Sequence, residues 1–266
     1  MIAPAASVIV TTRNSARTLA ACLRSIREQT YPQIELVVVD NASTDDTVAI
    51  AHAFADRVID AGPERSAQRN AGVAASSGEY LLIVDSDMVL DRDVVEACLA
   101  RIGEGDAVAI PEDSFGAGFW ARCKRFERDF YHGDPIVSAA RFFRRSAFLA
   151  AGGYDESLLG GEDWDLSMRV RASRPPLFAN AFIHHDEGHP RLGMLARKKF
   201  YYARGYRRFA RKHGWEGARR LTPMRAALVS RVGEMARHPV LAIGLTIMKT
   251  AEVAGFLVGL AMARDA

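Results

Sequence analysis

The feature that most constrains the fold is an alternation of apolar runs and helical patterns along the first 90 residues. The runs VIV at 8–10, LVVV at 36–39 and LLIV at 81–84 are apolar at consecutive positions, which is typical of strands that a parallel sheet buries on both faces. The predicted strands are 7–12, 35–40, 57–60 and 79–87, and the predicted helices between them are 15–29, 45–54 and 66–75. This order predicts an α/β fold whose mostly parallel sheet is flanked by helices.

Polar residues follow three of these strands. They run from Thr11 to Asn14, from Asp40 to Ser43, and from Asp85 to Asp87. In open α/β sheets, ligands bind outside the carboxyl ends of the strands, so we expect the three groups to meet in one crevice. Ser43 and the acids after it also predict a hydroxyl cap and an acidic first turn for the helix at 45–54.

Further elements are expected downstream. The sequence predicts a helix flanked by glycine-containing loops within 112–135, a strand at 136–145 with a short helix after it, a helix at 162–171, and a last strand at 177–183 that ends at His184 and His185.

The composition is that of a folded soluble chain. Of the 266 residues, 49% are hydrophobic and 25% are charged, which excludes a disordered chain, a collagen and a polytopic membrane protein. The three cysteines, at 22, 98 and 123, are too few for a disulfide framework and form no C-x-x-C zinc motif. The first residues lack the basic region of a secretory signal, so we expect a cytoplasmic protein.

Charge is distributed unevenly along the chain. Residues 1–190 carry 19 Lys and Arg against 28 Asp and Glu, whereas residues 191–237 carry 14 against 2. Such a basic block favours a polyanionic partner. The stretch 197–220, which mixes basic and aromatic residues, is compatible with a nucleic-acid surface, with a patch that binds anionic lipid, or with a solvated helix face. Because an apolar tail follows, we favour the lipid and predict no nucleic-acid partner.

The apolar tail extends from 238 to 262 and contains two charged residues. Lys249 and Glu252 lie three positions apart, so they can pair on one helix face. A lysine in mid-membrane costs about 2.5–3.5 kcal/mol, which counts against a single span. The alternatives are an interfacial helix or a hairpin of helices, a single tilted span, and a helix buried on the domain.

The sequence Asp85-Ser86-Asp87 is the strongest local signal for chemistry. Two carboxylates at the end of an apolar strand offer the hard oxygen ligands that Mg²⁺ and Mn²⁺ take together with substrate phosphates. The alternative is a capped surface turn. Asp40, at the end of the neighbouring strand, is placed either to bind a base or ribose or to cap the following helix.

Taken in order, these pieces resemble the inverting glycosyltransferases of family two, which have the GT-A fold of nucleotide-diphospho-sugar transferases. The matching stretches are SVIVTTRN at 7–14, ELVVVDNASTDDT at 35–47, ERSAQRNAG at 64–72, GEYLLIVDSDM at 78–88, RRSAFLAAGGYDE at 144–156, GEDWDLSMRVR at 161–171 and IHHDEG at 183–188. The resemblance covers roughly residues 5–210.

The resemblance implies roles for individual residues. The nucleotide and donor sugar would be bound by Thr11, Arg13, Asn14, Asp40, Arg69, Asp85 and Ser86. The metal ligands would be Asp87, Asp85 and one of the two histidines, His185 being the better match. Asp163, beside Glu162, would be the general base, although plain acidity at a helix start is the alternative. Thr11 stands where the family usually has proline, and Arg13 where an aromatic residue is frequent.

These roles agree with the chemistry of the reaction. A diphosphate leaving group gains negative charge as the glycosidic bond breaks, and a divalent cation stabilises that charge without a proton donor. Inversion then requires a base on the opposite face of the sugar, within hydrogen-bond reach of the acceptor hydroxyl. We therefore expect a metal-dependent hexosyl- or related transferase that uses Mg²⁺ or Mn²⁺.

We predict a GT-A domain over 1–210 and a basic and apolar helical segment over 211–266 that associates with the membrane. The acceptor would be a lipid-linked or cell-envelope glycan, and the protein would lie on the cytoplasmic membrane as a peripheral or monotopic enzyme. The alternatives are a nucleotidyltransferase and a non-catalytic nucleotide-sugar-binding protein. A nucleotidyltransferase needs a glycine-rich loop after the first strand, which TTRNSART does not provide.

Overall fold

The computed structural model describes residues 6–134, 136–171, 174–221 and 232–263, which form two compact units. The first unit comprises 1–112, 138–156 and 162–186, and the second comprises 113–137, 157–161 and 187–266. Segments from the middle of the chain therefore pack with the C-terminal helices in the second unit. The domain boundary at 210 stays a prediction.

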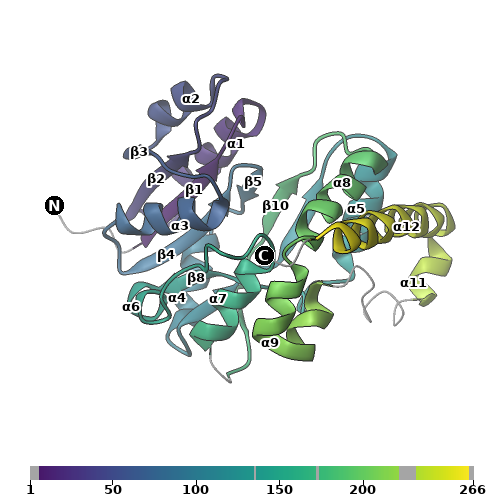
Figure 1. Cartoon of the computed structure of the whole chain (residues 1–266). Helices are drawn as coiled ribbons and strands as arrows, with labels where there is room; N and C mark the ends of the chain where they lie inside the picture. The colour runs from purple at the N-terminus through teal and green to yellow at the C-terminus, as the bar shows by residue number, and fades with distance from the viewer. Residues whose placement is uncertain (1–5, 135, 172–173, 222–231, 264–266) are drawn as a thin grey trace. The chain divides into compact units, whose positions relative to one another are not determined.

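The first unit is built on a seven-stranded sheet with the strand order β3-β2-β1-β4-β8-β6-β9 (Figure 1). Its strands are β1 (Ala6–Thr12), β2 (Ile34–Asp40), β3 (Arg57–Asp60), β4 (Tyr80–Asp85), β6 (Ala107–Ala109), β8 (Ala140–Arg144) and β9 (Leu177–Phe178). Strands β1 to β4 are parallel to one another, while β8 runs antiparallel to β4 and β6. The mostly parallel α/β sheet is thus confirmed.

Helices cover both faces of this sheet, which explains the uninterrupted apolar runs in its strands. The helices are α1 (Ala16–Arg27), α2 (Thr47–Phe54), α3 (Arg65–Ala74), α4 (Val94–Ile102), α6 (Arg145–Ala150) and α7 (Glu162–Arg171). Successive strand residues enter different cores: Val8 and Val10 pack with α1, α2 and α4, whereas Ile9 packs with α3, α6 and α7. Gly72 lets α3 approach the sheet, because a Cβ there would collide with the side chains of Ile9 and Val39.

A short antiparallel ladder determines the position of the residues after β4. Strand β5 (Met88–Leu90) pairs with β10 (Ile183–Asp186), with His185 opposite Met88. The amide of Asp186 donates a hydrogen bond to the carbonyl of Asp87 at 2.8 Å. This ladder brings Asp87 and His185 together although they lie almost 100 residues apart in the sequence.

The predicted last strand, 177–183, is wrong as a single element. The chain forms β9 in the large sheet, leaves it after Phe178 and begins β10 at Ile183 beside β5. It breaks because its two ends pair with different sheets. The predictions also missed α4, β5 and β6, as well as β7 (Glu112–Phe115), which precedes the helix expected within 112–135.

The second unit is mainly helical. Its helices are α5 (Phe119–Asp129), α8 (Leu192–Ala203), α9 (Tyr206–Leu221), α11 (Val232–Arg237) and α12 (Pro239–Met262). Its core contains Cys123 and Phe126 of α5, Phe130 directly after α5, Leu195 of α8, and Leu245 and Met248 of α12. Helix α12 is one continuous helix instead of a hairpin, and its 24 residues are long and apolar enough to cross a membrane by length and composition alone.

Candidate active site

Strand register places the first group of predicted site residues side by side. Thr11 of β1 lies opposite Asp85 of β4, and Thr12 lies opposite Asp40 of β2. The Thr11 hydroxyl lies 3.4 Å from Asp85 Oδ1, and both Thr11 and Asp40 are buried. The carboxyl ends of three parallel strands therefore meet as the sequence predicted.

Asp40 organises the loop that follows β2. Its carboxylate accepts hydrogen bonds from the amide of Ser43 at 2.7 Å and from the Ser43 hydroxyl at 2.5 Å. The Ser43 oxygen in turn accepts from the amide of Asn14 at 2.8 Å, and Asn14 Oδ1 accepts from the amide of Thr44 at 2.8 Å. These bonds tie the loops after β1 and β2 together.

The predicted Ser43 cap is wrong, because Ser43 is bound to Asp40 and Asn14. The carboxylate of Asp45 accepts a bond from the first helical amide, that of Thr47, at 3.1 Å. Helix α2 begins at Thr47, so the acids precede it and its first turn contains none.

The other predicted donor-binding residues lie nearer the surface. Arg13 and Asn14 are exposed, and the Ser86 hydroxyl lies 2.8 Å from that of Ser15.

Arg69 is the central cation of the site. It is fully buried, and its guanidinium lies 2.9 Å from Asp85 Oδ1, 2.7 Å from Asp163 Oδ1 and 3.4 Å from Glu162 Oε1. Burial alone would lower the pKa of Arg69, but the surrounding carboxylates outweigh it and hold that pKa above its ordinary value. The sequence placed Arg69 near the base or diphosphate; the structure places its guanidinium between Asp85 and Asp163.

Asp85 is held by two arginines. Besides the contact with Arg69, its Oδ2 lies 3.6 Å from Arg141 Nη1 of β8. Burial would raise the pKa of Asp85, but Arg69 and Arg141 outweigh it and hold that pKa far below the ordinary range. Asp85 is therefore ionised at any physiological pH.

Asp87 and His185 form the other end of the site. His185 Nδ1 lies 3.8 Å from Asp87 Oδ1, and His185 Nε2 lies 3.0 Å from Glu112 Oε2. Glu112 Oε1 also accepts a hydrogen bond from Arg141 Nε at 2.6 Å. The neighbouring His184 instead places Nε2 3.0 Å from Asp91 Oδ1. Of the two histidines, His185 is the one beside Asp87.

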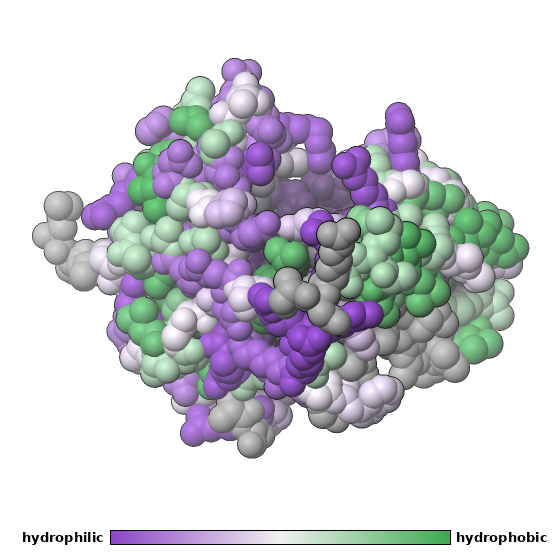
Figure 2. All heavy atoms as spheres, viewed as in Figure 1, coloured by the Kyte–Doolittle hydropathy of each residue, from purple (hydrophilic) through white to green (hydrophobic). Residues whose placement is uncertain are grey.

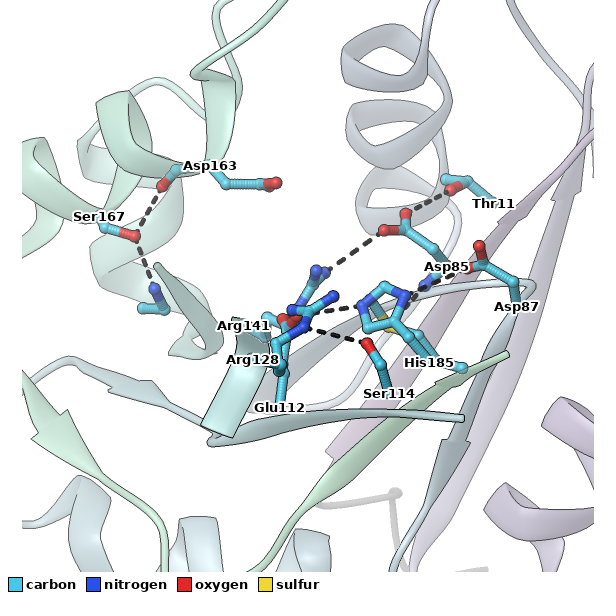
Figure 3. A network of polar contacts seen from close by, with 12 residues as sticks. Thr11, Asp85, Asp87, Glu112, Ser114, Arg128, Arg141, Asp163, Ser167 and His185 are labelled. Carbon is cyan, nitrogen blue, oxygen red and sulfur yellow. Dashed lines mark hydrogen bonds and ion pairs between the residues drawn. The ribbon is translucent and has the colours of Figure 1, made fainter. Parts of the chain in front are cut away.

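These contacts form one chain in which carboxylates alternate with two arginines and a histidine, and we call it the site network. Figure 3 labels its members except Arg69. In order along the chain, its members are Asp163, Arg69, Asp85, Arg141, Glu112, His185 and Asp87. The side chains in its middle are largely enclosed, whereas 25% of Asp163 and 46% of Asp87 is exposed. The two end carboxylates are therefore the ones that a ligand can reach.

Helix α7 fixes one end of the network. The Ser167 hydroxyl donates to the carbonyl of Asp163 at 2.6 Å and accepts from the amide of Ala140 at 2.8 Å, which ties α7 to β8. Glu162 is buried and lies 3.2 Å from Arg65. Burial and the neighbouring Asp163 raise the pKa of Glu162. The two adjacent acids therefore differ in exposure: both contact Arg69, but Glu162 is buried and Asp163 is partly exposed.

Arg141 and Glu112 were missed by the sequence analysis. Arg141 had a usable signal: it is a charged residue next to the apolar pair Phe142 and Phe143 in a predicted strand, and a buried charge requires a partner. Glu112 had no usable sequence signal, because its partners Arg141 and His185 are distant in sequence and no local pattern marks it.

The open end of the network has donors that suit a divalent cation. Ligands around a six-coordinate ion with bonds of about 2.1 Å lie between about 3 and 4.2 Å apart, and the separation of 3.8 Å between Asp87 and His185 falls in that range. Glu112 stands on the far side of the His185 ring, where a carboxylate commonly orients a ligating imidazole, although its 3.0 Å contact with Nε2 lacks the geometry of a hydrogen bond. Among the described residues, three ligand atoms within 4.8 Å of one another occur elsewhere, at Asp113, Asp129 and His132 of the second unit.

Comparison with known proteins shows which family the chain belongs to. The model of the family described as "Glycosyl transferase family 2" matches residues 7–149. A PGL/p-HBAD biosynthesis glycosyltransferase of Mycobacterium tuberculosis is 32% identical over 201 residues, which cover 69% of this chain and 75% of that protein. Glycosyltransferase GlyG of Streptococcus pneumoniae is 36% identical over 108 residues, covering 38% of this chain and 36% of its own.

Two solved structures share the fold. The mannosyltransferase PcManGT from Pyrobaculum calidifontis, in complex with GDP-Man and Mn²⁺, superposes with a TM-score of 0.68 at 17% identity and covers 100% of this chain and 89% of its own. TarS 1–349 of S. aureus with UDP-GlcNAc gives a TM-score of 0.51 at 18% identity, covering 96% and 90%. The sheet has the GT-A arrangement, and the chain belongs to glycosyl transferase family 2.

Proposed function

We propose that this protein is an inverting, metal-dependent glycosyltransferase that moves a sugar from a nucleoside-diphosphate sugar to an acceptor hydroxyl. The observation that carries the proposal is the site network, which ends in two reachable carboxylates at the carboxyl edge of the sheet. One carboxylate suits a base and the other suits a metal ligand. Similar folds solved with GDP-Man and with UDP-GlcNAc support the donor class.

The donor side is formed by the loops after β1, β2 and β4. Asp40 holds the loop that receives the base, and Thr11, Arg13 and Asn14 line the nucleotide pocket beside it. Asp85 and Ser86 face the ribose and diphosphate. Asp40 already accepts hydrogen bonds from Ser43. It would therefore recognise the base in one of two ways. It gives up the bond from the Ser43 hydroxyl and accepts one from the base, or it acts indirectly by ordering the loop that contacts the base.

Asp87, His185 and Asp85 would hold Mg²⁺ or Mn²⁺. When bound, the cation supplies positive charge next to the leaving diphosphate. The chain's own contribution is orientation: Glu112, held by Arg141, lies 3.0 Å from His185 Nε2 and would accept a hydrogen bond from that nitrogen once Nδ1, which faces Asp87, binds the metal. A similar fold solved with Mn²⁺ supports the metal.

Asp163 is the proposed general base. It takes the proton of the acceptor hydroxyl while the hydroxyl oxygen bonds to the anomeric carbon and the bond from that carbon to the diphosphate oxygen breaks. Arg69 keeps Asp163 oriented, and the Ser167 bonds hold the backbone at that position. Glu162 has a supporting role, because it is buried against Arg65 and Arg69.

For the acceptor we propose a lipid-linked or cell-envelope glycan, reached from the cytoplasmic face of the membrane. The apolar face of α12 and the basic residues before it support a peripheral or monotopic location. Family membership favours sugar transfer over the nucleotidyltransferase alternative. A non-catalytic nucleotide-sugar-binding protein is then the alternative that an experiment has to exclude.

The deciding experiment is Asp163→Asn, measured for donor binding and for turnover separately. Removing a general base lowers the rate by about 10²–10⁴-fold, while thermal stabilisation by a nucleoside diphosphate with Mn²⁺ should be retained. A panel of UDP- and GDP-sugars identifies the donor. Glu156→Gln, which removes an exposed carboxylate that binds Asn70, is the matched control and should keep full turnover. Equal turnover by both variants would contradict the proposal.

A further inference from the structure

Helix α12 presents an apolar stripe to solvent. Its large exposed side chains are each 47–66% accessible: Val240, Ile243, Ile247, Leu257, Val258 and Met262. Their spacing follows the helical period, so they share one face. Figure 2 shows hydrophobic residues gathered over this helix at the right of the view. In the described part of α12, every exposed residue is uncharged.

The two exposed polar residues on this face are satisfied within the helix. The hydroxyl of Thr246 donates to the carbonyl of Ala242, and that of Thr250 donates to the carbonyl of Thr246, each at 2.9 Å. A hydroxyl bonded to the preceding turn needs no water. The stripe can therefore enter an apolar medium without leaving a side-chain donor unpaired.

The charged residues of α12 lie on the opposite face. Lys249 and Glu252 are 6% and 1% exposed and lie 2.7 Å apart. Lys249 also contacts Glu127 of α5, and Glu252 lies 4.0 Å from Lys199 of α8. A transmembrane orientation would separate these charges from their partners or carry α5 and α8 into the bilayer. The pairs therefore favour a helix that stays docked.

Small residues fix α12 against α8 on this docked face. Gly255 and Gly259 form a G-x-x-x-G pair, a motif that allows close helix packing. A Cβ on Gly255 would collide with the carbonyl of Ala196, and one on Gly259 with the carbonyl of Phe200. The motif is thus used within the chain and is not available to a second copy, which leaves the apolar stripe as the outward surface.

A strongly basic part of the sequence precedes the docked helix. Residues 191–237 carry 14 Lys and Arg against 2 Asp and Glu. Arg197 and Lys198 of α8 are exposed, and Arg237 is exposed just before α12 begins. Juxtamembrane basic residues are attracted to anionic lipid headgroups. The charge therefore selects an anionic bilayer over a neutral apolar partner.

We propose that α12 binds the surface of an anionic phospholipid bilayer while lying in its plane. The stripe enters the boundary between headgroups and acyl chains, and Lys249 and Glu252 stay paired with α5 and α8. The helix, about 36 Å long at about 1.5 Å per residue, lies along the membrane instead of crossing it. In-plane binding specifies how the protein would contact the membrane named under the proposed function. It rests on that function only for the reason why the enzyme would be at a membrane.

The first test measures binding of the full chain to vesicles of phosphatidylcholine, with and without phosphatidylglycerol. We expect sedimentation with the anionic vesicles and a decrease with added salt. The double variant Ile247→Glu/Leu257→Glu should lose at least about tenfold in partitioning, because charge on the buried face opposes insertion. Leu149→Glu changes an equally exposed leucine, 58% accessible on α6, and should bind like the wild type.

Several results would overturn the proposal. The first is no binding of the wild type to anionic vesicles, and the second is equal binding by the double variant and the control. The third is a wild-type protein that binds no lipid but forms a dimer, with the double variant monomeric. Thermal unfolding of each variant verifies that it is folded. Sugar transfer to a soluble acceptor is measured in parallel, so failure of lipid binding is distinct from failure of the proposed function.

The second test distinguishes a helix in the plane from one that crosses. The three native cysteines are buried, so single cysteines at Val240, Ile247 and Val258 can be labelled with an environment-sensitive fluorophore. An in-plane helix places all three at a similar shallow depth, and lipid quenchers at two depths should affect them equally. Deep quenching at Ile247 with shallow quenching at Val240 would indicate a span and overturn the proposal.

Discussion

Each of the two units contains a network in which acidic side chains alternate with basic ones, and the networks differ in how far their carboxylates are exposed. The site network of the first unit runs from Asp163 to Asp87, and both end carboxylates are partly exposed. The second unit contains what we call the tail cluster, which is formed by Lys124, Glu127, Lys199, Lys249 and Glu252. Its carboxylates are 6% exposed or less, so they have no access to a ligand.

The difference follows from the elements that carry the charges. Parallel strands end at a common edge, where side chains from several strands converge and remain open to solvent. The tail cluster lies between helices α5, α8 and α12, where every carboxylate has an ammonium partner. Similar charge pairing thus supports binding in one unit and holds helices together in the other. Substitutions in the tail cluster should change stability, and those in the site network should change metal binding or turnover.

The largest expected stability effect is that of Lys249→Met in the tail cluster. This change leaves Glu127 and Glu252 buried with one fewer cation, and removing one partner of a buried ion pair costs about 3–5 kcal/mol. Urea unfolding at pH 7 measures the loss. Turnover per folded molecule on a soluble acceptor should stay unchanged.

A neutral version of the cluster provides the control. Lys249→Met combined with Glu127→Gln and Glu252→Gln should recover much of the lost stability, because no unpaired charge is then buried. If Lys249→Met lowered turnover a hundredfold in the folded protein, the separation between the two networks would be wrong.

Two neighbouring histidines sharpen the comparison inside the first unit. His185→Ala removes a proposed ligand beside Asp87 and should weaken Mn²⁺ binding by at least about 100-fold, since even outer-shell changes cost about 10–100-fold. His184→Ala removes the contact with Asp91 and the stacking on Phe182 and should leave the Mn²⁺ affinity unchanged. Titration of Mn²⁺ in the presence of a nucleoside diphosphate measures both. Equal losses in the two variants would remove His185 from the ligand set.

Much of the fold follows from local sequence because its strands are buried on both faces. The buried strands β1 and β2 lie within one residue of their predicted bounds. The half-exposed strand at 57–60 and the helix starting at Glu162 also have the predicted bounds. The break between β9 and β10 could not be predicted, since it depends on which strand each end pairs with. Strand pairing is a long-range property that residues 177–186 do not encode by themselves.

The site divides in the same way. The polar ends of β1, β2 and β4 could be predicted to converge, because the carboxyl ends of neighbouring parallel strands lie at the same edge of a sheet. The burial of Arg69 between Asp85 and Asp163 could not, since these residues are brought together only by the packing of α3 and α7. The functions given to these residues stay predictions until the variants are measured.

A smaller effect is expected for Glu112→Gln. The amide keeps the size of the side chain but weakens its hold on His185 Nε2 and on Arg141, so Mn²⁺ affinity should fall about tenfold. The control is Glu79→Gln, whose exposed pair with Arg144 contributes little. An affinity equal to that of the control would mean that Glu112 does not position the imidazole.

The smallest effect concerns Lys199, the most exposed member of the tail cluster, with 31% of its side chain accessible. Burial lowers the pKa of Lys199 to about 8, despite the opposing charge of Glu252. Between about pH 8 and the ordinary lysine value of about 10.4, the unfolded chain binds a proton that the folded chain has released. The stability contribution of Lys199 therefore rises with pH across this window.

At pH 7 the ammonium group of Lys199 is charged although it is partly buried, which costs free energy in the folded protein. Lys199→Met should therefore raise the free energy of unfolding by about 1 kcal/mol, a value reduced for solvent screening. The advantage should shrink as pH rises from 8 to 10. Unfolding is compared between wild type and variant at each pH, because the buried thiols of Cys22 and Cys98, whose pKa values burial raises, affect both proteins alike. An advantage that stayed constant up to pH 10 would show that the methionine acts through packing, and that Lys199 is not electrostatically part of the tail cluster.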